Sequence, residues 1–310
     1  MALRILSTER VARLPEPMGA PACALAGGTA FLVGPGIVRY TPGSSPVALV
    51  PSGRGVPIEP GFVVNGEGEL VLYGGHPEGD EHGALAAVEH RNPSTGELVP
   101  GVAPLGLPEA RRGLLAVPFR GASAVLFGGI PPLGSGPGGG KSSRSVWIHK
   151  IDHVRPLGLT IPIAGSYMQA GKVPGGVFLL GSDANASDLF ATRDAEGRPE
   201  VRTATALMVP NRFGVAVAQE TPESFFMVGG LGGPSMSARP DVWRFSAETG
   251  SEIIGNLAVE GEPYAVTHAA AFWIQSERAL YIAGGTRHAR AGLGRTVSAS
   301  ADVIRVVIGE

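Results

Sequence analysis

Arginine supplies most of the positive charge in this chain, since only three of its 25 basic residues are lysines. A guanidinium group is a rigid fork of donors that matches a carboxylate or a phosphate, whereas a lysine ammonium is a point charge. Several arginines stand just before apolar segments that are typical of strands, or in the glycine-rich segments between them. With a histidine and a tyrosine at similar positions they form the candidate ligand-binding set: Arg111, Arg112, Tyr167, Arg212, Arg239, His268 and Arg287.

Residues 76–82, with the sequence His-Pro-Glu-Gly-Asp-Glu-His, place imidazole and carboxylate groups close together. Such groups are ligands for zinc and other divalent ions. Their spacing matches no established metal motif, so a solvated polar loop is preferred, and His76, Asp80 and His82 are metal candidates of second rank. Residues 183–188 begin like a calcium loop, but Asp188 occupies the position of its turning glycine. We therefore predict no metal and no other cofactor.

The chain lacks the signatures of nucleophilic catalysis and of phosphate binding. It contains no Gly-x-Ser-x-Gly elbow, and no helical pattern follows the glycine-rich residues 134–143. Cys23 is the single cysteine, which excludes a disulfide within the chain. Its small apolar neighbours indicate a buried structural side chain. We therefore assign no catalytic residue, and a non-enzymatic function is favoured.

The elements that must position the candidate residues follow from a repeated phrase, a short apolar run closed by glycine. The first glycines of the phrase stand at positions 34, 74, 128, 181, 229 and 284, and the steps between them are 40 to 55 residues. A repeat of this length built of short strands is typical of propeller blades. Glycine tolerates the sharp turn and the close backbone approach that such a position requires.

We predict six four-stranded antiparallel blades in a single domain, with approximate bounds 15–55, 56–105, 106–161, 162–208, 209–261 and 262–310. The sixth blade has three strand-like segments, and residues 2–8 precede the first blade without a blade of their own. We therefore expect residues 2–8 to serve as the outer strand of the sixth blade, which closes the ring. Long loops are expected between the second and third strands, at 76–83, 130–144, 231–240 and 286–300, and such loops tend to hold binding residues.

The chain resembles the kelch-repeat β-propellers in the apolar run with two glycines, and in Asp-Val-Trp at 241–243, Ser-Val-Trp at 145–147 and Pro-Asn-Arg at 210–212. The resemblance implies an all-β, six-bladed, kelch-like fold in which Trp147 and Trp243 pack between blades. It also implies that arginines at the inner strands bind carboxylates of an acidic peptide. The alternative is that these arginines bond to neighbouring blades and hold them together.

Charge and hydropathy limit the partners. The net charge of −2 at pH 7 gives no general attraction to nucleic acid or to an anionic membrane. No segment approaches the roughly 20 apolar residues of a membrane span, and the N-terminus lacks the apolar core of a signal peptide. We expect a monomer that is either cytoplasmic or the mature form of an exported protein.

The expected function is a non-catalytic recognition scaffold that binds a protein or another acidic ligand at the loop face. One alternative is a kelch-like enzyme that acts on an acidic sugar, of the epimerase or mutarotase type. Such an enzyme needs a histidine or carboxylate of perturbed pKa beside arginines, and His268 is the first candidate. Another alternative is an extracellular carbohydrate-binding module, although an aromatic content of 6% offers few rings for a sugar platform.

Overall fold

The computed structural model of the chain describes residues 3–119, 123–135, 139–150, 152–181, 189–193, 199–203, 212–232, 236–291 and 294–310. These residues form strands and their connections, apart from one turn of 3-10 helix at Gln275–Glu277. No helix among them is long and apolar enough to cross a membrane. The chain divides into two compact units. We call Ala22–Tyr167 the central unit, and Met1–Pro21 together with Met168–Glu310 the terminal unit. That all six blades make one domain stays a prediction.

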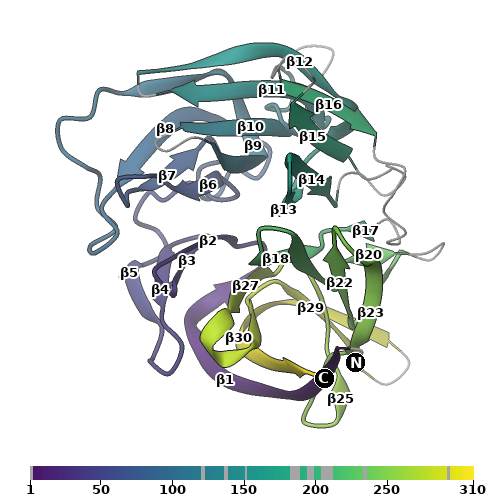
Figure 1. Cartoon of the computed structure of the whole chain (residues 1–310). Coiled ribbons are helices and arrows are strands. Elements are labelled where there is room, and N and C mark those ends of the chain that lie inside the picture. The colour runs from purple at the N-terminus through teal and green to yellow at the C-terminus, as the bar shows by residue number, and fades with distance from the viewer. Residues whose placement is uncertain are drawn as a thin grey trace. The chain divides into compact units, whose positions relative to one another are not determined.

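The central unit contains two antiparallel sheets (Figure 1). The first consists of β2 (Ala22–Ala26), β3 (Thr29–Val33), β4 (Ile37–Tyr40) and β5 (Val47–Val50). The second consists, in chain order, of β6 (Gly61–Val64), β7 (Leu70–Tyr73), β8 (Leu85–Arg91), β9 (Leu105–Phe119), β10 (Ser123–Ile130), β11 (Ser143–Lys150) and β12 (His153–Gly165). Its long strand β9 is shared, because Leu105 pairs with Val88 of β8 whereas Arg112 to Phe119 pair with β10. The second sheet therefore comprises two four-stranded groups.

The terminal unit contains three four-stranded antiparallel groups among its described residues. The first is β13 (Gln169–Val173), β14 (Gly176–Leu180), β15 (Leu189–Arg193) and β16 (Pro199–Thr203). The second is β18 (Ala216–Thr221), β19 (Ser224–Val228), β22 (Asp241–Ser246) and β23 (Gly250–Asn256). The third is β27 (Ala270–Ile274), β28 (Ala279–Ala283), the second half of β30 (Gly294–Gly309) and β1 (Arg4–Met18). The remaining strands are β17 (Arg212–Phe213), β20 (Leu231–Gly232), β21 (Ser237–Ala238), β24 (Ala258–Val259), β25 (Glu262–Pro263), β26 (Ala265–Thr267) and β29 (Thr286–Ala291).

Two segments that were expected to be long loops contain paired strands instead. Residues 286–300 form a hairpin in which β29 pairs with the first half of β30, and β26 joins it as a third strand. Residues 231–240 contain β20 and β21, which pair with each other, and β20 also pairs with β17. The β-branched residues Thr286 and Val297 favour an extended backbone, and cross-strand hydrogen bonds satisfy it. The glycines in these segments concealed that tendency.

The N-terminal segment supplies the outer strand beside β30, as expected. β1 pairs with β30 from Arg4 opposite Gly309 to Arg13 opposite Asp302, and Figure 1 shows the two strands side by side. β1 runs well beyond the predicted residues 2–8, because irregularities in its register let a long strand follow its partner. Ile5 packs against the apolar core, so this pairing also buries side chains.

The paired glycines join neighbouring strand groups within each unit. The Gly74 N–H donates to the Ala87 carbonyl at 2.9 Å, and the Gly75 N–H donates to the Arg111 carbonyl at 2.8 Å. The pairs at 229–230 and 284–285 repeat this pattern, with the second glycine donating toward the next inner strand. All six glycines have a positive φ, between 63° and 91°. Each diglycine is therefore a staple made of backbone, at positions that side chains would block.

Each unit has its own apolar core. In the central unit Trp147 is 4% exposed and belongs to one cluster with Val63, Val71, Leu114 and Leu126. In the terminal unit the largest cluster joins β19, β22, β28 and β30 through Phe226, Val242, Leu280 and Ile304. These cores fix the strands, and the strands position the residues that precede them.

Candidate functional site

Arg212 is held inside the terminal unit. It is 6% exposed, and its guanidinium forms a two-pronged ion pair with Asp241, in which Nη2 lies 2.6 Å from Oδ2. Its Nη1 also donates to the Gly229 carbonyl at 3.2 Å, while Trp243 Nε1 donates to Asp241 Oδ2 at 3.1 Å. Burial acts to raise the pKa of Asp241, but the hydrogen bonds and charge of Arg212 outweigh it, so the pKa lies below its usual range. This geometry favours the interpretation of Arg212 as a residue that holds strands together.

Arg111 has the same character in the central unit. It is 4% exposed, and its Nη2 donates to Glu109 Oε2 at 2.5 Å. Its guanidinium carbon lies 5.5 Å from the centre of the Trp147 ring, within the range of a cation–π contact. Arg111 is therefore engaged by the fold in much the way that Arg212 is.

Four polar side chains of the central unit meet at one carboxylate oxygen, and we call them the Glu59 cluster. The Tyr167 hydroxyl donates to Glu59 Oε2 at 2.5 Å. Arg112 Nη1 lies 3.5 Å from the same oxygen, and His76 Nε2 lies 3.8 Å from it. The Glu59 and Arg112 side chains are 20% and 18% exposed, so solvent reaches both. The structure thus brings together two candidate residues, Arg112 and Tyr167, with the metal candidate His76.

The backbone positions the Glu59 cluster through a short ladder. Glu59, Gly113 and Tyr167 all have a left-handed backbone, with φ of 56°, 60° and 52°. The Gly113 N–H donates to the Glu59 carbonyl at 2.8 Å, and the Tyr167 N–H donates to the Gly113 carbonyl at 2.9 Å. A Cβ on Gly113 would lie 3.2 Å from Tyr167 Cε1, so the glycine leaves room for the tyrosine ring. Equivalent residues of successive strand groups are thereby placed next to one another.

The charge distribution in the Glu59 cluster leaves donors and acceptors available. Burial raises the pKa of Tyr167 well above its usual range, and the Glu59 carboxylate raises it further, so the phenol stays protonated and donates. Arg112 Nε is buried and has no partner among the described residues. Its one contact, with Glu59, is long. An arginine with unused donors beside solvent can bind an anion or an acceptor.

No family model and no curated protein sequence matches the chain. A solved structure described as "Structure of YjhT" matches it with a TM-score of 0.70 at 12% sequence identity. The match covers 92% of this chain and 99% of that chain. The fold is that of a kelch-like β-propeller. The six four-stranded groups of described strands, three in each unit, are its blades, and β1 completes the sixth blade.

In the terminal unit of the propeller, His268 occupies the position that Tyr167 has in the central unit. Its φ is 53°, its N–H donates to the Gly214 carbonyl at 2.7 Å, and its ring meets Phe213 edge to face at 4.9 Å. Burial, and to a lesser degree the charge of His288, lowers the pKa of His268 to about 4. At neutral pH this imidazole is therefore uncharged. Because Gly214 turns the chain here, the inner strand begins at Ala216 instead of at Phe213 as expected.

The other candidate arginines of the propeller lie apart from these positions in the fold. The Arg287 guanidinium lies over the Tyr264 ring, 5.2 Å from its centre. Arg287 belongs to the paired strand β29, which was expected to be a loop. Arg239 precedes β22, and its N–H donates to the Gly230 carbonyl at 3.0 Å as part of the diglycine staple. Whether any of these arginines binds a ligand stays a prediction.

The structure separates the members of the candidate metal loop. His76 is 4% exposed, and its Nδ1 lies 2.9 Å from the Pro77 carbonyl, whereas Asp80 and His82 are exposed. Within the described ranges, no group of three histidine, cysteine, aspartate or glutamate side chains is placed to hold a metal ion. Residues 183–188, the candidate calcium loop, lie outside the described residues.

Sequence reasoning missed Glu59, although a signal for it is present. Glu59, Gly113 and Gly214 each stand 15 residues before the first glycine of a diglycine. Tyr167 and His268 stand at nearly the same distance from theirs. The one carboxylate at this repeated position, opposite the predicted Arg112, therefore marks the centre of the site.

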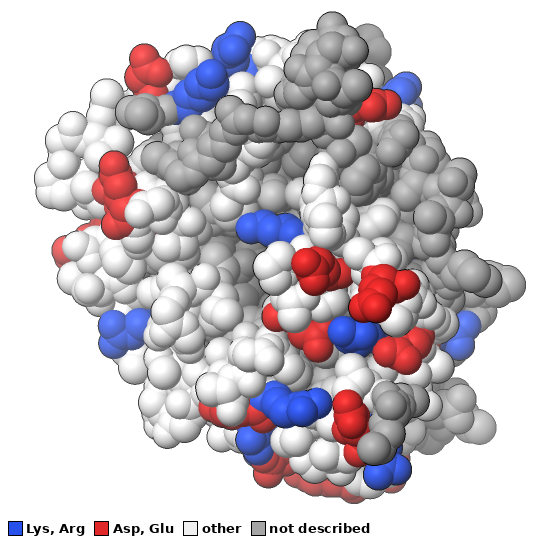
Figure 2. All heavy atoms as spheres, viewed as in Figure 1, with Lys and Arg blue, Asp and Glu red and all other residues white. Residues whose placement is uncertain are grey.

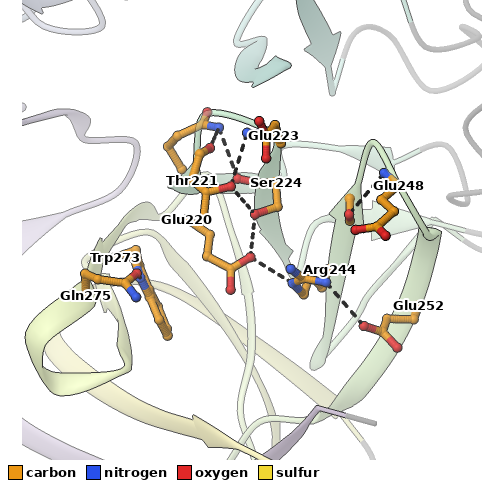
Figure 3. Close-up of polar contacts among 11 residues, drawn as sticks. Glu220, Thr221, Glu223, Ser224, Arg244, Glu248, Glu252, Trp273 and Gln275 are labelled. Carbon is orange, nitrogen blue, oxygen red and sulfur yellow. Dashed lines mark hydrogen bonds and ion pairs between the residues drawn. The ribbon is translucent and has the colours of Figure 1, made fainter. Parts of the chain in front are cut away.

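A second polar network, also unpredicted, ties β18, β19, β22 and β23 together in the terminal unit (Figure 3). Arg244 Nε donates to Glu220 Oε2 at 2.8 Å, and the Ser224 hydroxyl donates to the same oxygen at 2.6 Å. Arg244 Nη1 also lies 3.7 Å from Glu252 Oε1. Figure 2 shows acidic side chains gathered around a basic one over the part of the face where Figure 1 draws these strands. The arginine is shared among internal acids, so this network is structural.

Proposed function

We propose that this propeller is a recognition scaffold, and that its Glu59 cluster binds a ligand through a carboxylate group. The supporting observation is the state of Arg112. Its guanidinium makes a single contact of 3.5 Å, its Nε is unpartnered within the described part of the chain, and its side chain is 18% exposed. Arg111 and Arg212, by contrast, are buried and paired. A guanidinium with unused donors at a solvent-accessible position is suited to a carboxylate.

The position of the Glu59 cluster also supports the proposal. Its members precede inner strands, and backbone hydrogen bonds of 2.8 and 2.9 Å hold Glu59, Gly113 and Tyr167 in fixed relation. A binding group on such a frame loses little conformational freedom when a ligand binds. The cluster therefore offers a preorganised site.

The test is isothermal titration calorimetry with a triglutamate peptide, and with an amidated triglutamine peptide as the uncharged counterpart. We expect the propeller to bind triglutamate and not triglutamine. Arg112→Ala should weaken binding at least about tenfold, because a hydrogen bond to a charged group contributes about 1.5–3 kcal/mol. Arg155→Ala is the matched control, since Arg155 is an exposed arginine of β12 in the same unit. Equal affinities of the two variants would refute the proposal.

A proton-transfer enzyme acting on an acidic sugar is the second candidate, and one contact favours it. The 2.5 Å hydrogen bond from Tyr167 to Glu59 is an acid–base couple beside a cationic arginine. Such a couple could exchange a proton with a sugar hydroxyl. The measurement is the rate of anomer exchange of an acidic sugar by proton NMR, with Glu59→Gln expected to abolish any acceleration. An unaccelerated rate in the wild-type protein rules this candidate out.

A further inference from the structure

Glu59 presents one occupied and one open oxygen. Tyr167, Arg112 and His76 all approach Oε2, at 2.5, 3.5 and 3.8 Å. Oε1 accepts no hydrogen bond from any residue that the structure describes, and the side chain is 20% exposed. An ionised carboxylate accepts at both oxygens. The open oxygen is therefore an unused anionic acceptor beside the arginine.

His76 adds a second acceptor next to this carboxylate. Its Nδ1 lies 2.9 Å from the Pro77 carbonyl oxygen, which only accepts, so Nδ1 carries the proton. In the neutral imidazole Nε2 is then an acceptor, and it faces Glu59 Oε2 at 3.8 Å. Two acceptors at this separation lack a donor between or beside them. An ammonium group has three N–H donors and no acceptor, and so it meets this need.

The formal charges of Arg112 and Glu59 cancel, which bears on the kind of ligand that fits. A ligand that is only anionic would bring its carboxylate to Arg112 and thus close to the Glu59 carboxylate. Like charges at such short range repel and reduce the gain from Arg112. A ligand with one negative and one positive group avoids this repulsion, because its cation faces Glu59 while its carboxylate faces Arg112.

We infer that the ligand of the Glu59 cluster carries an ammonium group close to its carboxylate, as an amino acid or the free N-terminus of an acidic peptide does. The carboxylate binds the Arg112 guanidinium, and the ammonium binds Glu59 Oε1 with His76 Nε2 as a further acceptor. Tyr167 holds the opposite oxygen of Glu59 and so leaves Oε1 free. This inference rests on the proposed binding at Arg112, and it adds the second charge that the ligand must have.

The experiment compares triglutamate with a free N-terminus and the same peptide acetylated, by calorimetry on the full chain. The two probes differ only in the ammonium group. The wild-type protein should bind the free peptide about fivefold more tightly or better, as expected for one partly exposed charge pair. Glu59→Gln keeps an oxygen that accepts from Tyr167 but removes the charge, so it should bring the ratio of affinities close to one. Glu67→Gln, at an exposed acid of the same unit, is the matched control and should keep the ratio.

The outcomes separate this inference from the function on which it rests. Equal or tighter binding of the acetylated peptide by the wild-type protein overturns the inference, and so does a ratio that Glu59→Gln leaves unchanged. If the acetylated peptide binds equally well and Arg112→Ala weakens it, the proposed function stands alone. If Arg112→Ala changes neither affinity, the proposed function fails as well. Should Glu59→Gln not fold, His76→Phe removes the second acceptor and is expected to lower the ratio, and an unchanged ratio then overturns the inference.

Discussion

Replacing the second glycine of a diglycine by alanine tests the staple, and Gly285 is the sharpest site for it. Gly285 has φ of 84°, a conformation that disfavours an L side chain. A Cβ there would lie 2.7 Å from Ala269 Cβ and 2.8 Å from the Thr267 carbonyl oxygen. Both distances are shorter than van der Waals contact, so the backbone around residue 285 must shift.

The cost of Gly285→Ala has two parts. The left-handed conformation costs alanine about 1 kcal/mol. The shift weakens two hydrogen bonds, from Gly285 to Met18 at 2.7 Å and from Ser300 to Gly285 at 2.8 Å. Each contributes about 1 kcal/mol. The free energy of unfolding should therefore fall by about 3 kcal/mol. Gly261→Ala is the matched control, because Gly261 has φ of 83° but no heavy atom within 4 Å of its Cβ position. It should cost only about 1 kcal/mol.

The assay is equilibrium unfolding in urea followed by tryptophan fluorescence, since Trp243 and Trp273 lie in the same unit as both glycines. The midpoint of Gly285→Ala should lie clearly below that of Gly261→Ala. If the two midpoints coincide, the close approach contributes nothing and the staple argument is wrong. The comparison needs no ligand, so it is independent of the proposed function.

Three further predictions concern the framework. Arg212→Met should lower the free energy of unfolding by about 3–5 kcal/mol in urea titrations, because it leaves the Asp241 carboxylate partly buried without its cation; full stability in this variant would contradict the assigned role. Burial, then the charges of His90 and His153, lowers the pKa of His149 to about 4 from 6.5, so the folded form binds fewer protons. Its contribution is present above pH 6.5 and is lost as the pH falls toward 4, by about 2 kcal/mol at pH 5; His149→Phe should flatten the dependence of the urea midpoint on pH, and an unchanged dependence would assign the effect elsewhere. Deleting residues 1–10 should lower the melting temperature, since it removes most of the pairing of β1 with β30; an unchanged melting temperature would be incompatible with the closure.

The sequence was sufficient for the blades because the glycine phrase reflects a local requirement. A positive φ and a close carbonyl oxygen exclude side chains at Gly74 and its equivalents, so the repeat is visible in residue type. The closure by β1 could be predicted as well, since one strand was missing at one end and one was left over at the other. The hairpin at 286–300 could not, because glycine and arginine there conceal paired strands.

The candidate site was predicted only in part, and the reason lies in the alternation of strands. Arg111 and Arg112 are neighbours in β9, so their side chains point to opposite sides. Arg111 therefore reaches Trp147 and Glu109, whereas Arg112 reaches Glu59. Nothing in the residue types tells which of two adjacent arginines is bound by the fold and which keeps unused donors. That distinction depends on strand orientation and on partners distant in sequence.

The pairing of β1 with β30 also governs when the protein can finish folding. Glu9 and Arg305 are 296 residues apart in the sequence, yet their side chains lie 3.0 Å apart. A ribosome therefore releases β1 long before its partner exists, and the backbone donors of β1 stay unpaired for most of synthesis. Contacts between such distant segments form slowly. The terminal unit is thus the part of a nascent chain that most needs protection from aggregation, and it completes its sheet only after β30 has emerged.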